Sequence, residues 1–93
     1  MRIRYTRRAR ADLASVLTYL KERSDPGAEN VSRALKIAID LIGRFPEIGR
    51  LAGESETRVL PVGGYPYLIY WIVTEDEVRI VHIRHAARAR PAI

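Results

Sequence analysis

The chain of 93 residues contains no cysteine. Without thiols it has no disulfide framework, no thiolate nucleophile and no cysteine-based zinc site. Long apolar runs are also missing: the longest, Tyr65–Val73, has 9 residues and includes a proline, whereas a membrane-spanning helix needs roughly 20. No apolar stretch follows the basic residues of the N-terminus, so we expect no secretory signal. These absences, with a length that fits one domain, predict a single cytoplasmic domain over residues 1–93 that does not enter a membrane.

Acidic residues are missing from both ends of the chain. Residues 1–10 hold five arginines and residues 78–93 hold four, with no acid in either segment, whereas residues 11–77 hold seven bases and eleven acids. The formal net charge of +5 is therefore concentrated at the two ends. Arginine presents a planar, permanently charged fork that suits phosphates and carboxylates. The ends are thus either a solvated surface or a docking face for an acidic partner or a nucleic acid.

A strand and an amphipathic helix are indicated at the start of the chain. Polar and apolar residues alternate over residues 2–6, which is the pattern of a short strand. Thr6 is placed to cap a helix that we expect to end near Arg23. Apolar residues then recur at helical spacing, at Ala9, Leu13, Val16, Leu17 and Leu20. Arg8 and Asp12 are expected to pair weakly on the opposite, solvent-facing side.

A second helix follows after a short link. Asp25 as N-cap, with Pro26 at the first helical position, begins it, and Pro46 ends it. Its apolar stripe consists of Val31, Leu35, Ala38, Ile42 and Phe45. Because the link is so short, the two helices are expected to pack antiparallel as a hairpin.

Turn residues divide the second half of the chain into three strands. In chain order we expect a loop at 46–57, a strand at 58–62, a Gly-Gly turn, a strand at 67–73, a turn at 74–77, a strand at 78–83 and a basic tail at 84–93. Because every residue of 67–73 is apolar, we expect a central strand covered on both faces. The order β-α-α-β-β-β predicts an α+β fold, with a small antiparallel sheet packed against a helical hairpin.

Pro61 gives a hint about strand order. Proline cannot donate to a strand ladder, so its strand is expected at a sheet edge or at a bulge. If that strand is the edge, the first strand pairs beside the last. Both arginine-rich ends would then lie on one side of the molecule and form a single positive patch.

Catalytic and metal-binding patterns are largely missing. His82 and His85 are the only histidines, and their odd spacing directs them to opposite faces of a strand, so we expect no metal. We interpret His82 as a partly buried, hydrogen-bonded strand residue. Gly63-Gly64 reads as a hairpin turn rather than a phosphate loop, and no serine has a nearby histidine and acid. No cofactor is therefore predicted.

His85 is the one residue with acid–base potential. Positive charge on both sides, from Arg84 and Arg88, favours its neutral form, which acts as a base. Cleavage of RNA through its 2′-hydroxyl needs such a base, a cation at the phosphate and a proton donor. Arg58, Tyr67 and Arg84 are candidates for the other roles. We favour the alternative, in which His85 and the arginines form a binding surface, because a single histidine without a spaced partner is a weak signal.

Several segments together resemble the ParE branch of the RelE/ParE superfamily, the toxins of bacterial type II toxin–antitoxin pairs. In chain order they are Ala9-x-x-Asp12-Leu13, Tyr19-Leu20, Leu41-Ile42-x-x-Phe45-Pro46-x-x-Gly49-Arg50, Arg58-Val-Leu-Pro-Val62, Tyr65-x-Tyr67-Leu-Ile-Tyr70 and Ile80-x-His82-Ile-x-His85-x-x-Arg88-x-x-Pro91. No single segment is specific, but their order and spacing are. The family fold, a small antiparallel sheet with a helical hairpin, agrees with the element order above.

The superfamily contains two activities. RelE-type members cut messenger RNA on the ribosome, and they typically place an arginine at the start of the third strand. Here that position holds Tyr67, and no tyrosine follows Tyr70. Without that cation and proton donor, charge at the scissile phosphate is poorly stabilised. The resemblance therefore implies a toxin that is not an enzyme, with a RelE-like ribosome-dependent endoribonuclease (Arg58, Tyr67, Arg84, His85 and Arg88) as the alternative.

What the ParE resemblance implies is inhibition of DNA gyrase, blocked replication and growth arrest. The residues expected to contact gyrase or its DNA are Arg84, His85, Arg88 and Arg90. The expected partner is a ParD-like antitoxin that forms a hetero-oligomer with the toxin. Exposed apolar positions on the hairpin, around Leu17, Leu20 and Ile39, are expected to receive an amphipathic helix of that antitoxin.

Overall fold

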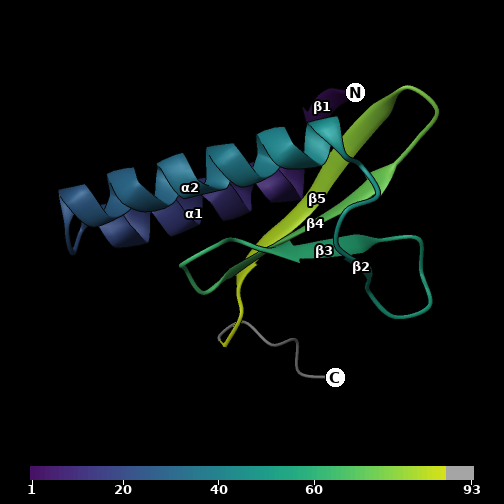
Figure 1. Cartoon of the computed structure of the whole chain (residues 1–93). Helices are drawn as coiled ribbons and strands as arrows, with labels where there is room; N and C mark the ends of the chain where they lie inside the picture. Colours follow the sequence, from purple (N-terminus) through teal and green to yellow (C-terminus); the bar gives the residue numbers. More distant parts are fainter. Residues whose placement is uncertain (88–93) are drawn as a thin grey trace.

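The computed structural model describes residues 1–87 and packs a helical hairpin against a five-stranded sheet (Figure 1). The elements are β1 (Arg2–Tyr5), α1 (Arg7–Lys21), α2 (Asp25–Arg44), β2 (Arg50–Leu51), β3 (Arg58–Pro61), β4 (Tyr67–Val73) and β5 (Glu77–His85). The strand order is β1-β5-β4-β3-β2, with β1 parallel to β5 and the other pairs antiparallel. The predicted α+β fold and the pairing of the first strand with the last are confirmed. The sheet is mixed, however, rather than wholly antiparallel.

Hydroxyl caps begin both helices. Thr6 Oγ1 accepts a hydrogen bond from the Ala9 amide at 3.0 Å, as predicted. The second cap is Ser24, whose Oγ accepts from the Gly27 amide at 3.1 Å, so the prediction of Asp25 as N-cap is wrong by one residue. Asp25 is instead the first helical residue. Its carboxylate there interacts favourably with the positive end of the helix dipole.

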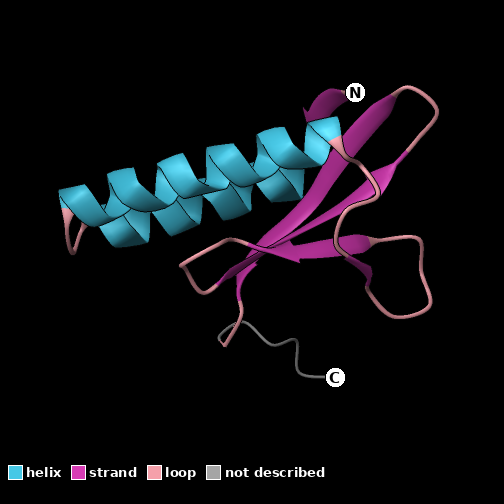
Figure 2. Ribbon diagram, viewed as in Figure 1, coloured by secondary structure: helices cyan, strands magenta, loops and turns pink. Residues whose placement is uncertain are grey.

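The helices run antiparallel and side by side, with their connecting turn away from the sheet (Figure 2). The side of α2 toward the sheet is buried at Val31, Leu35, Ala38, Ile39 and Ile42, which confirms most of its predicted stripe. Phe45 is the exception: it caps the helix with 58% of its surface exposed. Within residues 1–87, neither helix is long and apolar enough to cross a membrane.

The central strand β4 shows alternating burial. Tyr67, Ile69 and Trp71 are buried, whereas Leu68 and the other residues of the alternate face are only half-buried. Its central place in the sheet was predicted from its apolar run, but the expectation that both faces are covered is wrong. The hairpin covers one face of the sheet (Figure 1). On the other face the β5 neighbours of Leu68, Tyr70 and Ile72 are Arg84, His82 and Arg79, which shield it only in part.

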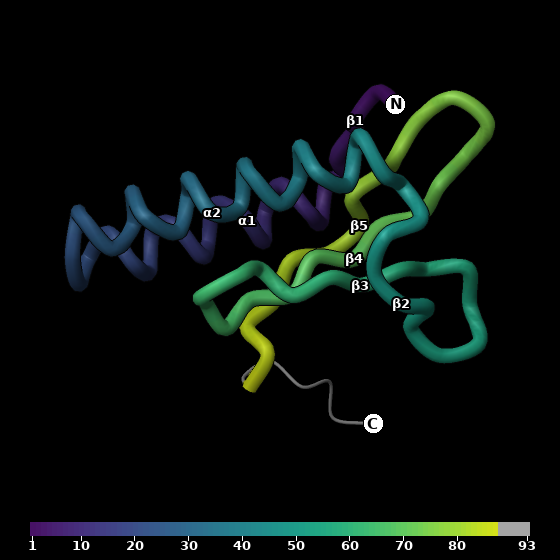
Figure 3. Tube along the Cα trace, viewed as in Figure 1, coloured from purple at the N-terminus to yellow at the C-terminus, as the bar shows by residue number. Residues whose placement is uncertain are grey.

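A two-residue strand interrupts the predicted loop at 46–57. β2 pairs antiparallel with β3, where Arg50 lies opposite Val59 and Leu51 opposite Arg58. A wide loop connects the two strands (Figure 3). β3 is therefore not the edge strand. β2 begins opposite Val59 and runs away from Pro61, so the proline has no strand partner on that side and its missing N–H costs no ladder hydrogen bond.

The arginines of the N-terminal strand do not join those at the end of β5. Because β1 is parallel to β5, Arg2 lies opposite Glu77 at the start of β5, while Arg84 lies near its far end. The Glu77 carboxylate is 3.8 Å from Arg2 and 2.9 Å from Arg79. The predicted patch from both ends is therefore wrong for Arg2. Residues 84 and 85 also belong to β5 rather than to a tail, which corrects the predicted end of the strand.

Candidate functional site

An open cavity of about 460 Å³ lies between α1 and the second half of β5. Helix α1 contributes Arg8, Asp12 and Tyr19, β4 contributes Tyr67, and β5 contributes His82, Arg84 and His85. Both described members of the predicted target-binding set, Arg84 and His85, therefore line one cavity. Arg88 and Arg90 lie outside the residues that the structure describes.

The start of α1 takes the place of a strand along the outer edge of β5. β1 ends at Tyr5, opposite Ile80, so the rest of this edge has no strand neighbour. The Thr6 amide donates to the Ile80 carbonyl at 3.0 Å, and Thr6 Oγ1 donates to the Val81 carbonyl at 3.3 Å. Asp12 Oδ2 then accepts from the Ile83 amide at 3.1 Å. Thr6 and the Asp12 side chain thus satisfy backbone groups that would otherwise need a longer β1.

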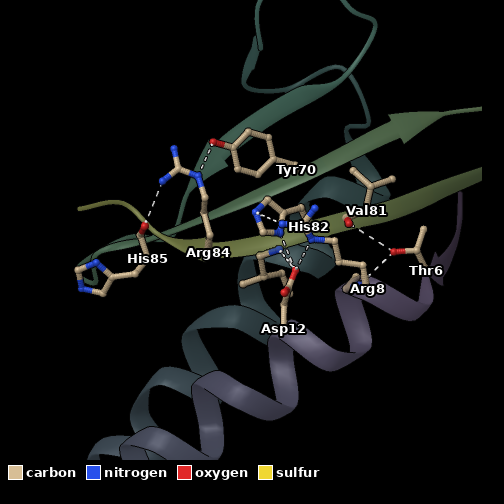
Figure 4. A network of polar contacts seen from close by, with 10 residues as sticks. Thr6, Arg8, Asp12, Tyr70, Val81, His82, Arg84 and His85 are labelled. Atoms are coloured by element: carbon tan, nitrogen blue, oxygen red, sulfur yellow. Dashed lines mark hydrogen bonds and ion pairs between the residues drawn. The ribbon is translucent and has the colours of Figure 1, made fainter. Parts of the chain in front are cut away.

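Asp12 also fixes His82 (Figure 4). Its Oδ2 lies 2.6 Å from His82 Nδ1, and because the carboxylate only accepts, the proton of this bond is on Nδ1. Arg8 approaches the other ring nitrogen at 3.5 Å, and its Nε is 3.9 Å from the carboxylate. The ring stacks on Tyr70, with centroids 5.5 Å apart. The prediction of His82 as a partly buried, hydrogen-bonded strand residue is confirmed.

Arg84 is held across the open face of the sheet. Its Nε donates to Tyr70 Oη at 3.1 Å, and its Nη1 donates to the His85 carbonyl at 3.2 Å (Figure 4). Nη1 also donates to the Ala86 carbonyl at 3.4 Å. These three bonds position the guanidinium at the end of β5. The side chain is half-buried, which leaves part of its planar fork accessible to an anionic group.

His85 occupies a different environment from His82. Its ring meets Tyr67 edge-on at 5.4 Å, and its Nδ1 accepts from the Ala87 amide at 3.1 Å. Tyr67 and Tyr70 lie on opposite faces of β4, so the two imidazoles do not converge on one atom. Among residues 1–87 no three His, Cys, Asp or Glu side chains cluster closely enough to hold a metal ion.

Arg58 is absent from this cavity, whose lining includes the other described members of the predicted nuclease set. It lies opposite Trp71 and donates to the Glu47 carbonyl at 3.0 Å, whereas His85 lies opposite Tyr67. Four residues of β4 separate these two points, a distance of about 13 Å at roughly 3.3 Å per residue. The structure therefore does not bring Arg58 together with Arg84 and His85.

A second groove runs between the helices and the outer edge of β1. It has a volume of about 330 Å³, and its lining includes Leu17, Ile39, Tyr5 and Asp40. Burial raises the pKa of the Tyr5 phenol, and the negative charge of Asp40 raises it further. The expectation that Ile39 is exposed is wrong, since 6% of its surface is accessible and it packs in the core. Leu20 is half-buried against the core.

A family model described as the ParE toxin of the type II toxin–antitoxin system parDE matches residues 3–90. The chain belongs to the ParE toxin family. A relative in Caulobacter vibrioides named Toxin RelE2 is 39% identical over 84 residues, which is 90% of this chain and 93% of that protein. A solved structure of the chromosomal ParDE toxin–antitoxin system from P. aeruginosa superposes with a TM-score of 0.69 at 21% identity, covering 91% of this chain and 95% of that one. This ParE-family chain is therefore a type II toxin with the fold that the resemblance implied.

Two residues of the toxin's network, Asp12 and Tyr70, were not recognised as site residues from the sequence. Asp12 was assigned to the solvent-facing side of α1 with Arg8, but its carboxylate turns toward β5. A signal was present, because Asp12 lies three residues after Ala9 and four before Val16, both in the apolar stripe. Tyr70 gave no such signal within its uniformly apolar run.

Replacing Asp12 with alanine is expected to destabilise the fold. The change leaves the Ile83 amide and His82 Nδ1 without their acceptor, which costs about 1–3 kcal/mol in the free energy of unfolding. Asp12→Asn keeps one acceptor oxygen and should recover part of the loss. Arg8→Ala is the control, with an expected change below about 1 kcal/mol because its ion pair is exposed. Urea denaturation measures all three, and equal values for Asp12→Ala and Arg8→Ala would contradict this account.

Proposed function

We propose that this toxin inhibits DNA gyrase and that a ParD-like antitoxin neutralises it. Membership in the ParE family supports the target, since the inhibition of gyrase is what the family resemblance implies. The proposed mode of action is binding: the toxin favours the state of gyrase in which DNA is cleaved, because it has a higher affinity for that state than for the others. In this mechanism gyrase breaks the DNA and the toxin breaks no bond.

The separation of the nuclease candidates favours binding over RNA cleavage. Cleavage at a phosphate needs a base, a cation and a proton donor around one reacting group. Arg58 lies about 13 Å along the sheet from His85 by strand geometry. Tyr67, at the position where RelE-type members place arginine, is 97% buried and thus poorly placed to donate a proton to substrate.

The surface proposed to contact gyrase or its DNA is the end of β5. Arg84 and His85 lie there, and Arg88 and Arg90 follow in the sequence. The half-buried guanidinium of Arg84 is held at this end of the strand by Tyr70 and the His85 carbonyl, and a guanidinium suits a phosphate or a carboxylate. Contacts of this kind weaken as salt rises, and inhibition should weaken with them.

The groove beside β1 is the surface proposed for the antitoxin. Leu17 contributes to its apolar lining, which suits the apolar face of an amphipathic helix, whereas Ile39, with 6% of its surface accessible, offers little contact area. Leu17 also lines an adjoining depression toward the turn between the helices. Leu20 keeps its proposed role at the half-buried margin of the hairpin.

Pulse labelling in cells tests the proposed function. Expression of the toxin without an antitoxin should stop thymidine incorporation first, because replication forks meet trapped gyrase. Amino-acid incorporation should fall only later. Co-expression of the matching antitoxin should restore both. Loss of amino-acid incorporation before thymidine incorporation would instead point to messenger RNA as the target.

The second candidate function is RelE-like cleavage of messenger RNA on the ribosome. It is favoured by one observation, the RelE name of the 39% identical relative from Caulobacter vibrioides. In this case Arg84 and His85 would act on RNA without Arg58. Cleaved transcripts recovered from translating ribosomes would support this candidate over the first.

A further inference from the structure

A β-bulge in β5 decides which of its side chains face the open side of the sheet. On β4, Trp71 pairs with Ile80 and Tyr70 pairs with His82. Val81, which lies between the two β5 residues, is therefore left without a partner in this register. An extra residue of this kind shifts the alternation of a strand by one position, and bulges are frequent beside functional sites, where they redirect a side chain.

Without the bulge, Arg84 would point into the core. Val78 and Ile80 are fully buried, and continued alternation would bury positions 82 and 84 as well. After the bulge the buried residue is instead Ile83, with 2% of its surface exposed. The bulge therefore places Arg84 on the face of the sheet that the hairpin does not cover (Figure 1).

The start of the chain holds the bulge and the residues that follow it. Thr6 Oγ1 donates to the carbonyl of Val81 itself at 3.3 Å. Asp12 Oδ2 accepts from the Ile83 amide at 3.1 Å, and the same oxygen lies 2.6 Å from His82 Nδ1 (Figure 4). These bonds fix the backbone at the bulge together with the direction of the histidine ring.

The His82 ring in turn supports Tyr70. The two rings stack with centroids 5.5 Å apart and an angle of 27° between their planes. The half-buried tyrosine then accepts a hydrogen bond at its hydroxyl oxygen from Arg84 Nε at 3.1 Å. Asp12, His82, Tyr70 and Arg84 thus form a continuous series of contacts, which we call the Arg84 array (Figure 4).

The Tyr70 hydroxyl ties the guanidinium to a neighbouring strand. Arg84 Nη1 donates to the carbonyls of His85 and Ala86, but these residues directly follow Arg84 in the chain and move with it. A long arginine side chain samples many rotamers and loses this freedom when it binds a target. Fixing one such side chain in advance improves affinity by roughly three- to tenfold.

We propose that Tyr70 is a positioning residue of the toxin, whose hydroxyl, held through His82 and Asp12, directs the guanidinium of Arg84 toward an anionic group of the target. The role of Arg84 as a target contact rests on the proposed function. The positioning itself does not depend on which target the toxin has, because phosphates and carboxylates bind the same planar fork.

Tyr70→Phe tests the proposal, because it removes the hydroxyl and keeps the ring that stacks on His82. The amount of toxin that halves the growth rate of cells should rise by roughly three- to tenfold. The Tm should fall by no more than about 8 °C, so the variant stays folded. In the isotope-labelled full chain, the Nε–Hε signal of Arg84 should move.

Tyr65→Phe is the matched control. It also removes a phenol hydroxyl, from a partly buried tyrosine that does not line the cavity between α1 and β5. Its toxicity should stay within twofold of the wild type, and the Arg84 signal should not move. Normal toxicity of Tyr70→Phe, or an unmoved Arg84 signal in that variant, would overturn the proposal.

A double-mutant cycle distinguishes positioning from a structural role. In Arg84→Lys the Cε methylene takes the place of Nε and donates no hydrogen bond, while the charge keeps toxicity measurable. Addition of Tyr70→Phe to this variant should change the required amount of toxin by less than twofold. The same three- to tenfold loss in both backgrounds would make Tyr70 merely structural and would overturn the proposal.

Trapping of purified gyrase on DNA tells the two possible failures apart. Trapping by the wild type that Tyr70→Phe leaves unchanged would overturn the positioning role and leave the proposed function intact. No trapping by the wild type would overturn the proposed function alone. The growth measurements and the Arg84 signal would then still decide whether Tyr70 positions the arginine.

Discussion

Arg84→Glu is expected to abolish growth arrest while the protein stays folded. The guanidinium is held at the end of β5 by Tyr70 and by two backbone carbonyls. Reversal of its charge places a carboxylate where we propose that the target presents anionic groups. The toxin concentration that gives half-maximal trapping of gyrase on DNA should rise by roughly 30-fold or more, equivalent to about 2 kcal/mol. Loss of the bond to Tyr70 should cost only about 1 kcal/mol of stability.

Two variants make this result specific. Arg84→Lys keeps the charge but loses the planar fork, and it should fall between the wild type and Arg84→Glu. Arg10→Glu makes the same charge change on an exposed residue of α1 that does not line the cavity, and it should keep near-normal toxicity. Equal loss in Arg10→Glu and Arg84→Glu would mean that net charge alone is responsible. Full growth arrest with folded Arg84→Glu would remove Arg84 from the mechanism.

Gly49→Ala is expected to cause the largest loss of stability from a single methyl group. Gly49 has a φ of +82°, and a Cβ there would lie 2.5 Å from the Val59 carbonyl oxygen and 3.1 Å from the Trp71 ring. Neither neighbour yields easily, because Val59 is in the sheet and Trp71 is fully buried with its indole bonded to the Pro46 carbonyl at 2.9 Å. We expect a loss of about 3 kcal/mol or more and a Tm lower by roughly 15 °C.

Gly53→Ala separates the effect of the steric contact at Gly49 from the effect of a left-handed backbone conformation. Gly53 has a similar φ of +72°, but a Cβ there would meet no atom within 4 Å. It should therefore cost only about 1 kcal/mol, the penalty for a left-handed alanine. Thermal unfolding of both variants measures the difference. Equal losses would show that the approach of Gly49 to Val59 and Trp71 does not constrain the fold.

The helices were predictable because their signals are local. Thr6 caps α1 through its own side chain, and the apolar spacing of α2 identifies the residues that enter the core. The cap of α2 was misplaced by one residue, since Ser24 and Asp25 both suit that position and only the backbone conformation decides between them. Phe45 fits the same spacing but lies at the last turn, where the chain leaves the core.

The sheet was predictable in part, because strand pairing depends on distant residues. The run at 67–73 indicated the central strand. The pairing of β1 with β5 is correct, but it was inferred by taking the Pro61 strand as the edge, and that edge is β2. The parallel direction of that pair, which separates Arg2 from Arg84, is set by how the helical hairpin returns to the sheet. β2 is too short, at two residues, to leave a pattern in the sequence.

The candidate site was only partly predictable for the same reason. Arg84 and His85 were selected from their charge and chemistry, and both line the cavity. The hydrogen bonds of Asp12 to His82 and Ile83 join residues about 70 positions apart. They form because β1 pairs with β5 only as far as Ile80, which leaves later backbone groups of β5 without a strand partner. Arg58 had the required chemistry, but strand register alone places it away from His85.

The most direct test of the account is double-strand cleavage of supercoiled plasmid by purified gyrase in the presence of the purified toxin, run beside transcript cleavage on translating ribosomes. The account predicts linear plasmid after the enzyme is denatured, in amounts that rise with toxin and fall with Arg84→Glu, together with intact transcripts. Cut transcripts with plasmid left supercoiled would contradict it.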